Sequence, residues 1–287
     1  MPVDLVAAER FVLANARVID RHRLAVLLHG APVEPFLRAL SAYQNDDGGF
    51  GHALEPDVRS PHSEPVSALR AIELLNEVGA PDDRMMAEAA AWVGAIALAD
   101  GGVPVVMPTA AAYPHAPWMV ASEGASFLTL AIAGALLEAG SREPWLERAT
   151  AWSWSALARP DELSAYWVKC ALAFLDAVPD ESRASAALEQ IRPMLGDSGS
   201  LPVAGGIEGE RLTPLVLSER PRARSRALFT DEQIANDLDR LEREQQDDGG
   251  WTFDWLAWSP GQSVEWRGAI TVQAVRTLIT HGRIEER

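Results

Sequence analysis

Two stretches of the sequence share one core, YQNDDGGFGHALEPD at residues 43–57 and EQQDDGGWTFDW at residues 244–255. Each carries glutamine, two acidic residues, a Gly-Gly pair and an aromatic residue. An Asp side chain can bond the backbone two residues on, and glycine tolerates a positive φ. We therefore expect one kind of tight turn at both places, with Gln44 and Gln245 or Gln246 satisfying free backbone groups at helix ends. Phe50 and Trp251 then plug into the core.

Two further joints, ADGGVP at 99–104 and GDSGSLP at 196–202, carry related chemistry. The four long joints cover 46–63, 100–121, 196–229 and 246–264. Between the joints, apolar residues recur three and four apart, which predicts helices. The predicted helices are 5–28, 34–44, 64–79, 82–99, 122–140, 143–159, 161–178, 180–195, 230–245 and 265–282. No segment alternates with period two, so we expect an all-α protein with only short strand pairings inside long loops.

Short joints such as GAPDD at 79–83 and RPDE at 159–162 predict antiparallel helical hairpins. Repetition of such hairpins about every fifty residues indicates a ring or a solenoid. We expect a single domain over 1–287, with an N-terminal helix within 1–30 and an irregular, arginine-rich loop at 196–229.

The pattern Gln-x-x-Asp-Gly-Gly-Phe/Trp, followed by a loop and an apolar helix, resembles the repeat of terpenoid cyclases and of protein prenyltransferase β subunits. DGGFGHALEPDVRSPHSEP at 47–65 is similar to the glycine loop of the prenyltransferases. The resemblance covers most of 30–282 and is weakest over 196–229. It implies an α/α toroid of five or six helical hairpins around a central funnel, with the long loops crowded around one mouth.

Several family motifs are absent. The sequence has no Asp-x-Asp-Asp acid, and the nearest match, Asp237-Leu238-Asp239, lies in a polar predicted helix. The single cysteine, Cys170, has Val168 two positions before it, whereas zinc prenyltransferases place Asp there. PDDRMMAE at 81–88 lacks the third Asp of the magnesium motif of class I terpene synthases. We therefore expect that the chain is not a zinc prenyltransferase and that it binds no metal ion and no cofactor.

Glu55 and Asp57 in the first long loop are the candidate catalytic residues. Burial and mutual repulsion raise the pKa of one carboxyl in such a pair, so a proton can be held for delivery to an alkene. The alternative is structural: Glu55 caps or bridges to Arg59, and Asp57 bonds the amides of the next helix.

Polar and aromatic residues of the long loops and of the neighbouring inner helices are candidates for substrate binding, because pockets form in such concavities and aromatic faces stabilise carbocations. They are His52, His62, Tyr113, His115, Trp118, Trp167, Asp254, Trp255, Trp258, Glu265 and Trp266. Alternate arginines in an extended chain would face one side and could bind a diphosphate: Arg220, Arg222 and Arg224. The alternatives are hydrogen-bonded surface histidines, packing tryptophans and a solvated arginine loop.

The composition excludes several functions. Lys and Arg number 25 against 41 Asp and Glu, a net charge of -16, which disfavours nucleic acid as a partner. One cysteine permits no internal disulfide and suits the cytoplasm, and no apolar run is long enough to cross a bilayer.

The resemblance and the acid pair together indicate a terpenoid-cyclase-like enzyme that cyclises or isomerises an isoprenoid or other apolar chain. The alternatives are a non-catalytic module that binds a hydrophobic ligand or a partner protein, and a glycan-active toroid. The sequence does not indicate an oligomeric state.

Overall fold

The computed structural model describes residues 3–81, 83–159 and 163–284. By its internal contacts the chain divides into two compact units, Met1–Ala39 with Arg192–Arg287, and Leu40–Ile191. The prediction of one domain over the whole chain stays a prediction, as does closure of the hairpins into a ring. The predicted joints at 79–83 and 159–162 lie partly outside the described residues.

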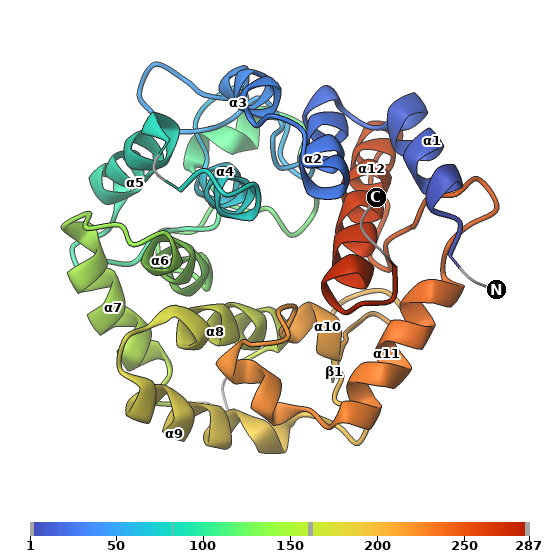
Figure 1. The fold of residues 1–287 in the computed structure, drawn as a ribbon. Helices are drawn as coiled ribbons and strands as arrows, with labels where there is room; N and C mark the ends of the chain where they lie inside the picture. Colours follow the sequence, from blue (N-terminus) through green and yellow to red (C-terminus); the bar gives the residue numbers. More distant parts are fainter. Residues whose placement is uncertain (1–2, 82, 160–162, 285–287) are drawn as a thin grey trace. The chain divides into compact units, whose positions relative to one another are not determined.

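Helices dominate both units, so the predicted all-α class is confirmed (Figure 1). Within the described residues, the only two strands form a short antiparallel pair inside a long joint, Leu201–Pro202 (β1) with Arg211–Leu212 (β2). The helices are α1 Leu5–Asn15, α2 Val18–His29, α3 Glu34–Ser41, α4 Pro65–Glu77, α5 Arg84–Ile96, α6 Leu128–Glu138, α7 Trp145–Ala156, α8 Ala165–Ala177, α9 Glu181–Ile191, α10 Pro214–Leu217, α11 Asp231–Arg243 and α12 Pro260–Thr280. No helix of the described chain combines the length and apolar character needed to cross a membrane.

The unit Leu40–Ile191 consists of three helical hairpins. Helices α4, α6 and α8 contact one another as an inner row, and α5, α7 and α9 each pack on the inner helix before them in the chain (Figure 1). Every residue of α6 from Leu128 to Leu136 is buried, as expected for a helix that is apolar all round. A Cβ at Gly134 would lie 2.8 Å from the carbonyl oxygen of Ala173, so glycine allows α6 and α8 to approach closely.

In the other unit, α12 packs against α1, α2 and α11, and α10 packs on α11. Its core is made by the facing apolar residues of these elements and includes Phe11, Val12, Trp251, Val272 and Leu278. The predicted plug residues are confirmed: Phe50 and Trp251 are 0% and 1% exposed, each in its own unit.

The four acidic or glycine-rich joints all open with one turn, as predicted. In each, the N–H of the first residue donates to the carbonyl four positions on, and its own carbonyl accepts from the N–H three positions on. The fourth residue is always a glycine with φ between +73° and +93°, a conformation that other residues adopt rarely. The first residues of the four turns are Asn45, Leu98, Gly196 and Gln246.

The second glycine of each Gly-Gly pair is required for space. An added Cβ would lie 2.5 Å from Ser63 Cβ at Gly49 and 2.2 Å from Ala125 Cβ at Gly102. The predicted side-chain bonds are also present. Asp47 Oδ1 accepts from the Gly49 N–H at 2.9 Å, and the Gln44 amide donates to the Gly48 carbonyl at 3.2 Å. The last turn repeats both contacts: Asp248 accepts from the Gly250 N–H, and the Gln245 amide donates to the Gly249 carbonyl.

Three expectations about element boundaries are wrong. The helix predicted over 122–140 begins only at Leu128. The predicted N-terminal helix is two helices, because Ala16 is extended (φ -80°, ψ 160°) and packs on Gly268 of α12, where a Cβ would lie 2.7 Å from that of Ala16. Helix α12 begins at Pro260 instead of 265, since the Ser259 side chain caps it by accepting from the Gln262 N–H at 3.2 Å.

Candidate functional site

The first long loop is irregular yet buried. Residues 53–58 and 63–65 are all buried, and within 51–65 only His52 and His62 are exposed. Loops normally run over the surface, because buried backbone needs hydrogen-bond partners. This loop has them: the Glu64 N–H donates to the Phe50 carbonyl at 2.8 Å and the His52 N–H to the Ser60 carbonyl at 2.9 Å.

The second long loop pairs with the first. The Arg59 N–H donates to the Pro114 carbonyl at 2.9 Å, and the Ala116 N–H donates to the Asp57 carbonyl at 2.8 Å. Val58 and His115 form an isolated antiparallel bridge between these bonds. Residues 57–59 and 114–116 are thereby held side by side.

The chain is strained where it enters the first loop. His52 and Ala53 have φ of 54° and 60°, which is rare for residues other than glycine, and each such conformation costs about 1–3 kcal/mol. Gly51, just before them, is pressed against backbone, since a Cβ there would lie 2.1 Å from the His62 carbonyl oxygen. His52 Nε2 and Asn45 Oδ1 lie 2.9 Å apart. Strain held in place by surrounding contacts is common at functional sites.

Three carboxyl groups lie in this buried loop. The predicted acids Glu55 and Asp57 are 6% and 4% exposed, and Glu64, which we did not predict, is 1% exposed. One oxygen of Glu64, Oε2, accepts from the Met107 N–H at 2.7 Å. The other, Oε1, is buried and has no hydrogen-bond partner within the described residues.

Burial raises the pKa of Glu64, and the Met107 N–H and the Ser60 hydroxyl offset only part of that rise by stabilising the charged form. Its position was visible in the sequence as the residue before Pro65, the first residue of α4. Nothing in the sequence, however, shows that a helix end is sealed from water. Ser67, one turn further along α4, is 1% exposed, and its hydroxyl also has no partner in the described chain.

The remaining candidates of this unit fall into two groups. The Tyr113 hydroxyl lies 3.2 Å from His62 Nε2, with the rings edge to face at 5.6 Å, and His115 Nδ1 lies 2.7 Å from the Tyr113 carbonyl oxygen. Trp118 is 43% exposed. Trp167 belongs to a half-buried aromatic cluster, with ring centroids 6.0 Å from Trp152 and 6.1 Å from Phe127, which also contacts Tyr166.

In the unit Met1–Ala39 with Arg192–Arg287, Trp255 lies between two other rings, 4.8 Å from Phe253 and 5.1 Å from Trp266. Glu265 and Trp266 lie in α12. Asp254 is exposed and Trp258 is half-buried. The Trp255 indole N–H is buried without a partner in the described residues.

The expected extended geometry of the arginine segment is wrong. A turn closes at its start, where the Ala223 N–H donates to the Arg220 carbonyl at 3.1 Å, and Arg224–Leu228 form a 3-10 helix. Arg220, Arg222 and Arg224 therefore do not lie along one side of a strand. The Pro221 between the first two favours a turn, because its ring fixes φ.

No group of three His, Cys, Asp or Glu residues in 3–81, 83–159 and 163–284 is arranged to hold a metal ion. Cys170 is buried, and burial raises the pKa of its thiol to about 12.

No family model matches the sequence, and no curated protein is similar to it in sequence. Among solved structures, a protein from Actinoplanes is similar to it with a TM-score of 0.59 at 18% identity, covering 97% of this chain and 100% of that one. The ligand-free type II terpene cyclase MstE from Scytonema has a TM-score of 0.55 at 13% identity, covering 97% and 98%. A single-substitution variant of MstE in complex with merosterolic acid A, its product, has a TM-score of 0.56 at 13% identity, covering 97% of this chain and 96% of that one. The chain therefore has a terpene-cyclase-like fold.

Proposed function

We propose that the chain is a terpenoid-cyclase-like enzyme that cyclises or isomerises an isoprenoid or another apolar chain, with the buried loop at residues 51–65 as the source of the proton. The observation that carries this proposal is the burial of three carboxyl groups in one irregular, strained loop. The solved complexes of MstE with an isoprenoid substrate and with its product, on a similar fold, support the substrate class.

The chemistry requires one acid and one base. A protonated carboxyl transfers its proton to an alkene carbon, so a C–H bond forms, the π bond breaks and a cation is left on the neighbouring carbon. For cyclisation, a second alkene of the same chain attacks that cation, so a ring closes and the positive charge moves to another carbon. In both cyclisation and isomerisation, a carboxylate then removes a proton next to the cationic carbon to form a new alkene. Glu55 and Asp57 are the proposed pair. When two carboxyl groups have well-separated pKa values, one can donate a proton and the other can accept one at the same pH.

Under this proposal, burial of the loop excludes the water that would quench a cation. We assign the stabilising π faces to Trp167 and its aromatic neighbours in the same unit. Further proposed binding residues of this unit are His52, His62, Tyr113, His115 and Trp118. In the other unit, the roles of Asp254, Trp255, Trp258, Glu265 and Trp266 in substrate binding, and of Arg220, Arg222 and Arg224 in diphosphate binding, stay predictions from the sequence and form no part of this proposal.

The test is incubation of the purified chain with farnesyl and geranylgeranyl diphosphates and with unphosphorylated polyprenes. Gas chromatography with mass spectrometry should detect a cyclised or isomerised product that disappears in Asp57→Asn or Glu55→Gln. Glu123→Gln is the matched control, because Glu123 is an exposed acid of the same unit, a few residues before α6. A product that persists in both acid variants would refute their assignment.

A non-catalytic module is the second candidate, and the missing Asp-x-Asp-Asp motif favours it. Native mass spectrometry would then show a co-purified apolar ligand that is never turned over. A glycan-active protein would instead give heat on titration with oligosaccharides, and a flat titration would exclude that alternative.

A further inference from the structure

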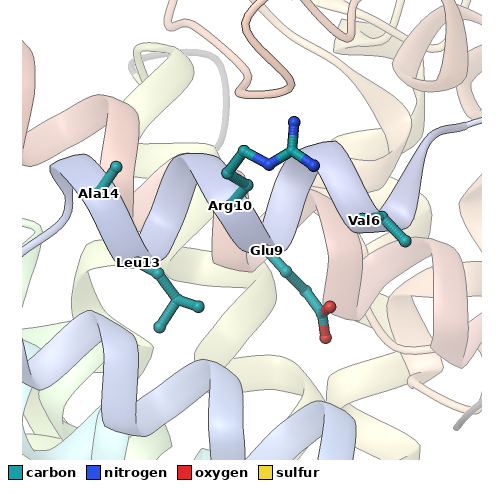
Figure 2. A pocket seen from close by; sticks show the side chains of 5 residues that line it. All are labelled: Val6, Glu9, Arg10, Leu13 and Ala14. Atoms are coloured by element: carbon teal, nitrogen blue, oxygen red, sulfur yellow. The ribbon is translucent and has the colours of Figure 1, made fainter.

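One face of α1 is exposed and combines two apolar side chains with two opposite charges. Val6 is 46% exposed and Leu13 62% exposed. With Glu9, Arg10 and Ala14 they line an open groove of about 480 Å³ (Figure 2). Large apolar side chains exposed together mark interaction surfaces more often than isolated ones do.

The positions of these residues on the helix limit what can dock there. Val6 and Leu13 are seven residues apart, close to two turns, so they lie nearly on one line along the helix. Figure 2 shows the Glu9 and Arg10 side chains leaving α1 in opposite directions. Because the two are consecutive, they are separated by only about 1.5 Å along the helix axis.

We propose that this face of α1 binds the same face of α1 in a second copy of the chain, with the two helices parallel about a two-fold axis. That symmetry places Glu9 of each copy against Arg10 of the other, so two ion pairs form. Val6 and Leu13 each meet their own counterpart, as residues near a two-fold axis do. An antiparallel pair would instead bring Glu9 against Glu9 and Arg10 against Arg10, which repel each other.

The contacts that Glu9 and Arg10 make within the chain still allow both side chains to form ion pairs with a second copy. Glu9 uses one oxygen, Oε1, on His29 Nε2 at 2.6 Å, and a carboxylate accepts hydrogen bonds at both oxygens. Arg10 is exposed. The charges on this face therefore complement a second copy without loss of the contact between α1 and α2.

The dimer is weak and depends on concentration. One helix face is smaller than the roughly 1,200 Å² or more that stable interfaces bury, and each chain has a net charge of -16. At about 0.15 M salt the screening length is about 8 Å. Long-range repulsion between the chains is then largely screened, whereas ion pairs in direct contact persist.

Sedimentation velocity of the full chain over about 1–300 µM in about 0.15 M salt should show reversible dimerisation. Glu9→Arg and Arg10→Glu should each raise the dissociation constant by about tenfold or more, and the double variant should restore it, because the two charges are exchanged together. Val264→Ser should change nothing, since Val264 is an exposed residue of α12. A single monomeric species throughout, or no restoration in the double variant, would overturn the proposal.

Disulfide crosslinking tests the direction of the helices. Leu13→Cys should oxidise to a covalent dimer joined through position 13 in both copies, whereas Val264→Cys should not. The native Cys170 does not interfere, because it is buried. Preferential crosslinking between a Val6→Cys chain and a Leu13→Cys chain would indicate antiparallel helices and overturn the arrangement.

Discussion

Replacement of Asp47 with alanine tests whether the repeated turn holds the acidic loop in place. Its carboxylate accepts three hydrogen bonds, from the Gly49 N–H at 2.9 Å, the Ser63 hydroxyl at 2.6 Å and the Trp92 indole N–H at 3.0 Å. It thereby joins the turn, the end of the first long loop and α5. The alanine variant loses all three bonds at once.

The expected loss of stability follows from the number of these bonds and their exposure. A hydrogen bond to a charged group contributes about 1.5–3 kcal/mol, but Asp47 is exposed, so we take about 1 kcal/mol for each. Asp47→Ala should therefore lower the free energy of unfolding by about 3 kcal/mol. Asp46→Ala removes the same charge from an exposed neighbour and should change it by less than about 0.5 kcal/mol.

Urea unfolding followed by tryptophan fluorescence measures the midpoint and slope for both variants. Amide hydrogen exchange at residues 45–63 then shows whether the loss is local to the turn and loop. Asp47→Asn should fall between the wild type and Asp47→Ala, because its amide retains only one acceptor oxygen. Equal midpoints for the Asp47→Ala and Asp46→Ala variants would refute the reasoning.

Three further predictions follow from burial. The folded state raises the pKa of Glu64 above its ordinary 4.5, so the folded chain binds this proton more tightly than the unfolded chain does. In urea titrations, the stability of the wild type relative to Glu64→Gln should therefore fall as pH rises from near 4.5 to the folded pKa, by at most about 1.4 kcal/mol per pH unit. The same pH dependence in both proteins would contradict the raised pKa. Gly51→Ala should lower the free energy of unfolding by about 1–3 kcal/mol or more, since its Cβ meets backbone. Gly261→Ala, where an added Cβ meets nothing within 4 Å, should leave thermal stability unchanged or raise it by at most about 1 kcal/mol, because Gly261 lies in α12. Cys170, with a thiol pKa of about 12, should react with a disulfide reagent only after unfolding, and rapid labelling of the folded chain would contradict its burial.

The turns were predictable because their causes are local. An Asp followed by two glycines carries the acceptor, the positive φ and the lack of a Cβ within three residues. The start of α12 was missed although Ser259 and Pro260 form a helix start signal, because the residues after them are polar and include Gly261. Local chemistry decides such elements only when neighbouring signals agree.

The break between α1 and α2 could not be predicted in this way. Apolar periodicity continues through it, and the reason for the break is the packing of Ala16 on Gly268, more than 200 residues away in sequence. Burial of the acids is also a tertiary property. The sequence indicated the chemistry of Glu55 and Asp57, but it could not show that Glu64 is sealed more completely than either.

The first and last turns differ in the side-chain bonds that they add to the shared backbone pattern. All four share the backbone bonds, so that pattern serves the fold. In the first turn, Asn45 also reaches into its loop, with Nδ2 donating to the Pro61 carbonyl and to the Ser63 hydroxyl, both at 3.0 Å. At the same position of the last turn, the Gln246 amide donates only locally, to the Glu244 carbonyl at 2.6 Å. The additional bonds of Asn45 hold the loop immediately before Glu64, so the first copy of a structural repeat has become the support of the acidic loop.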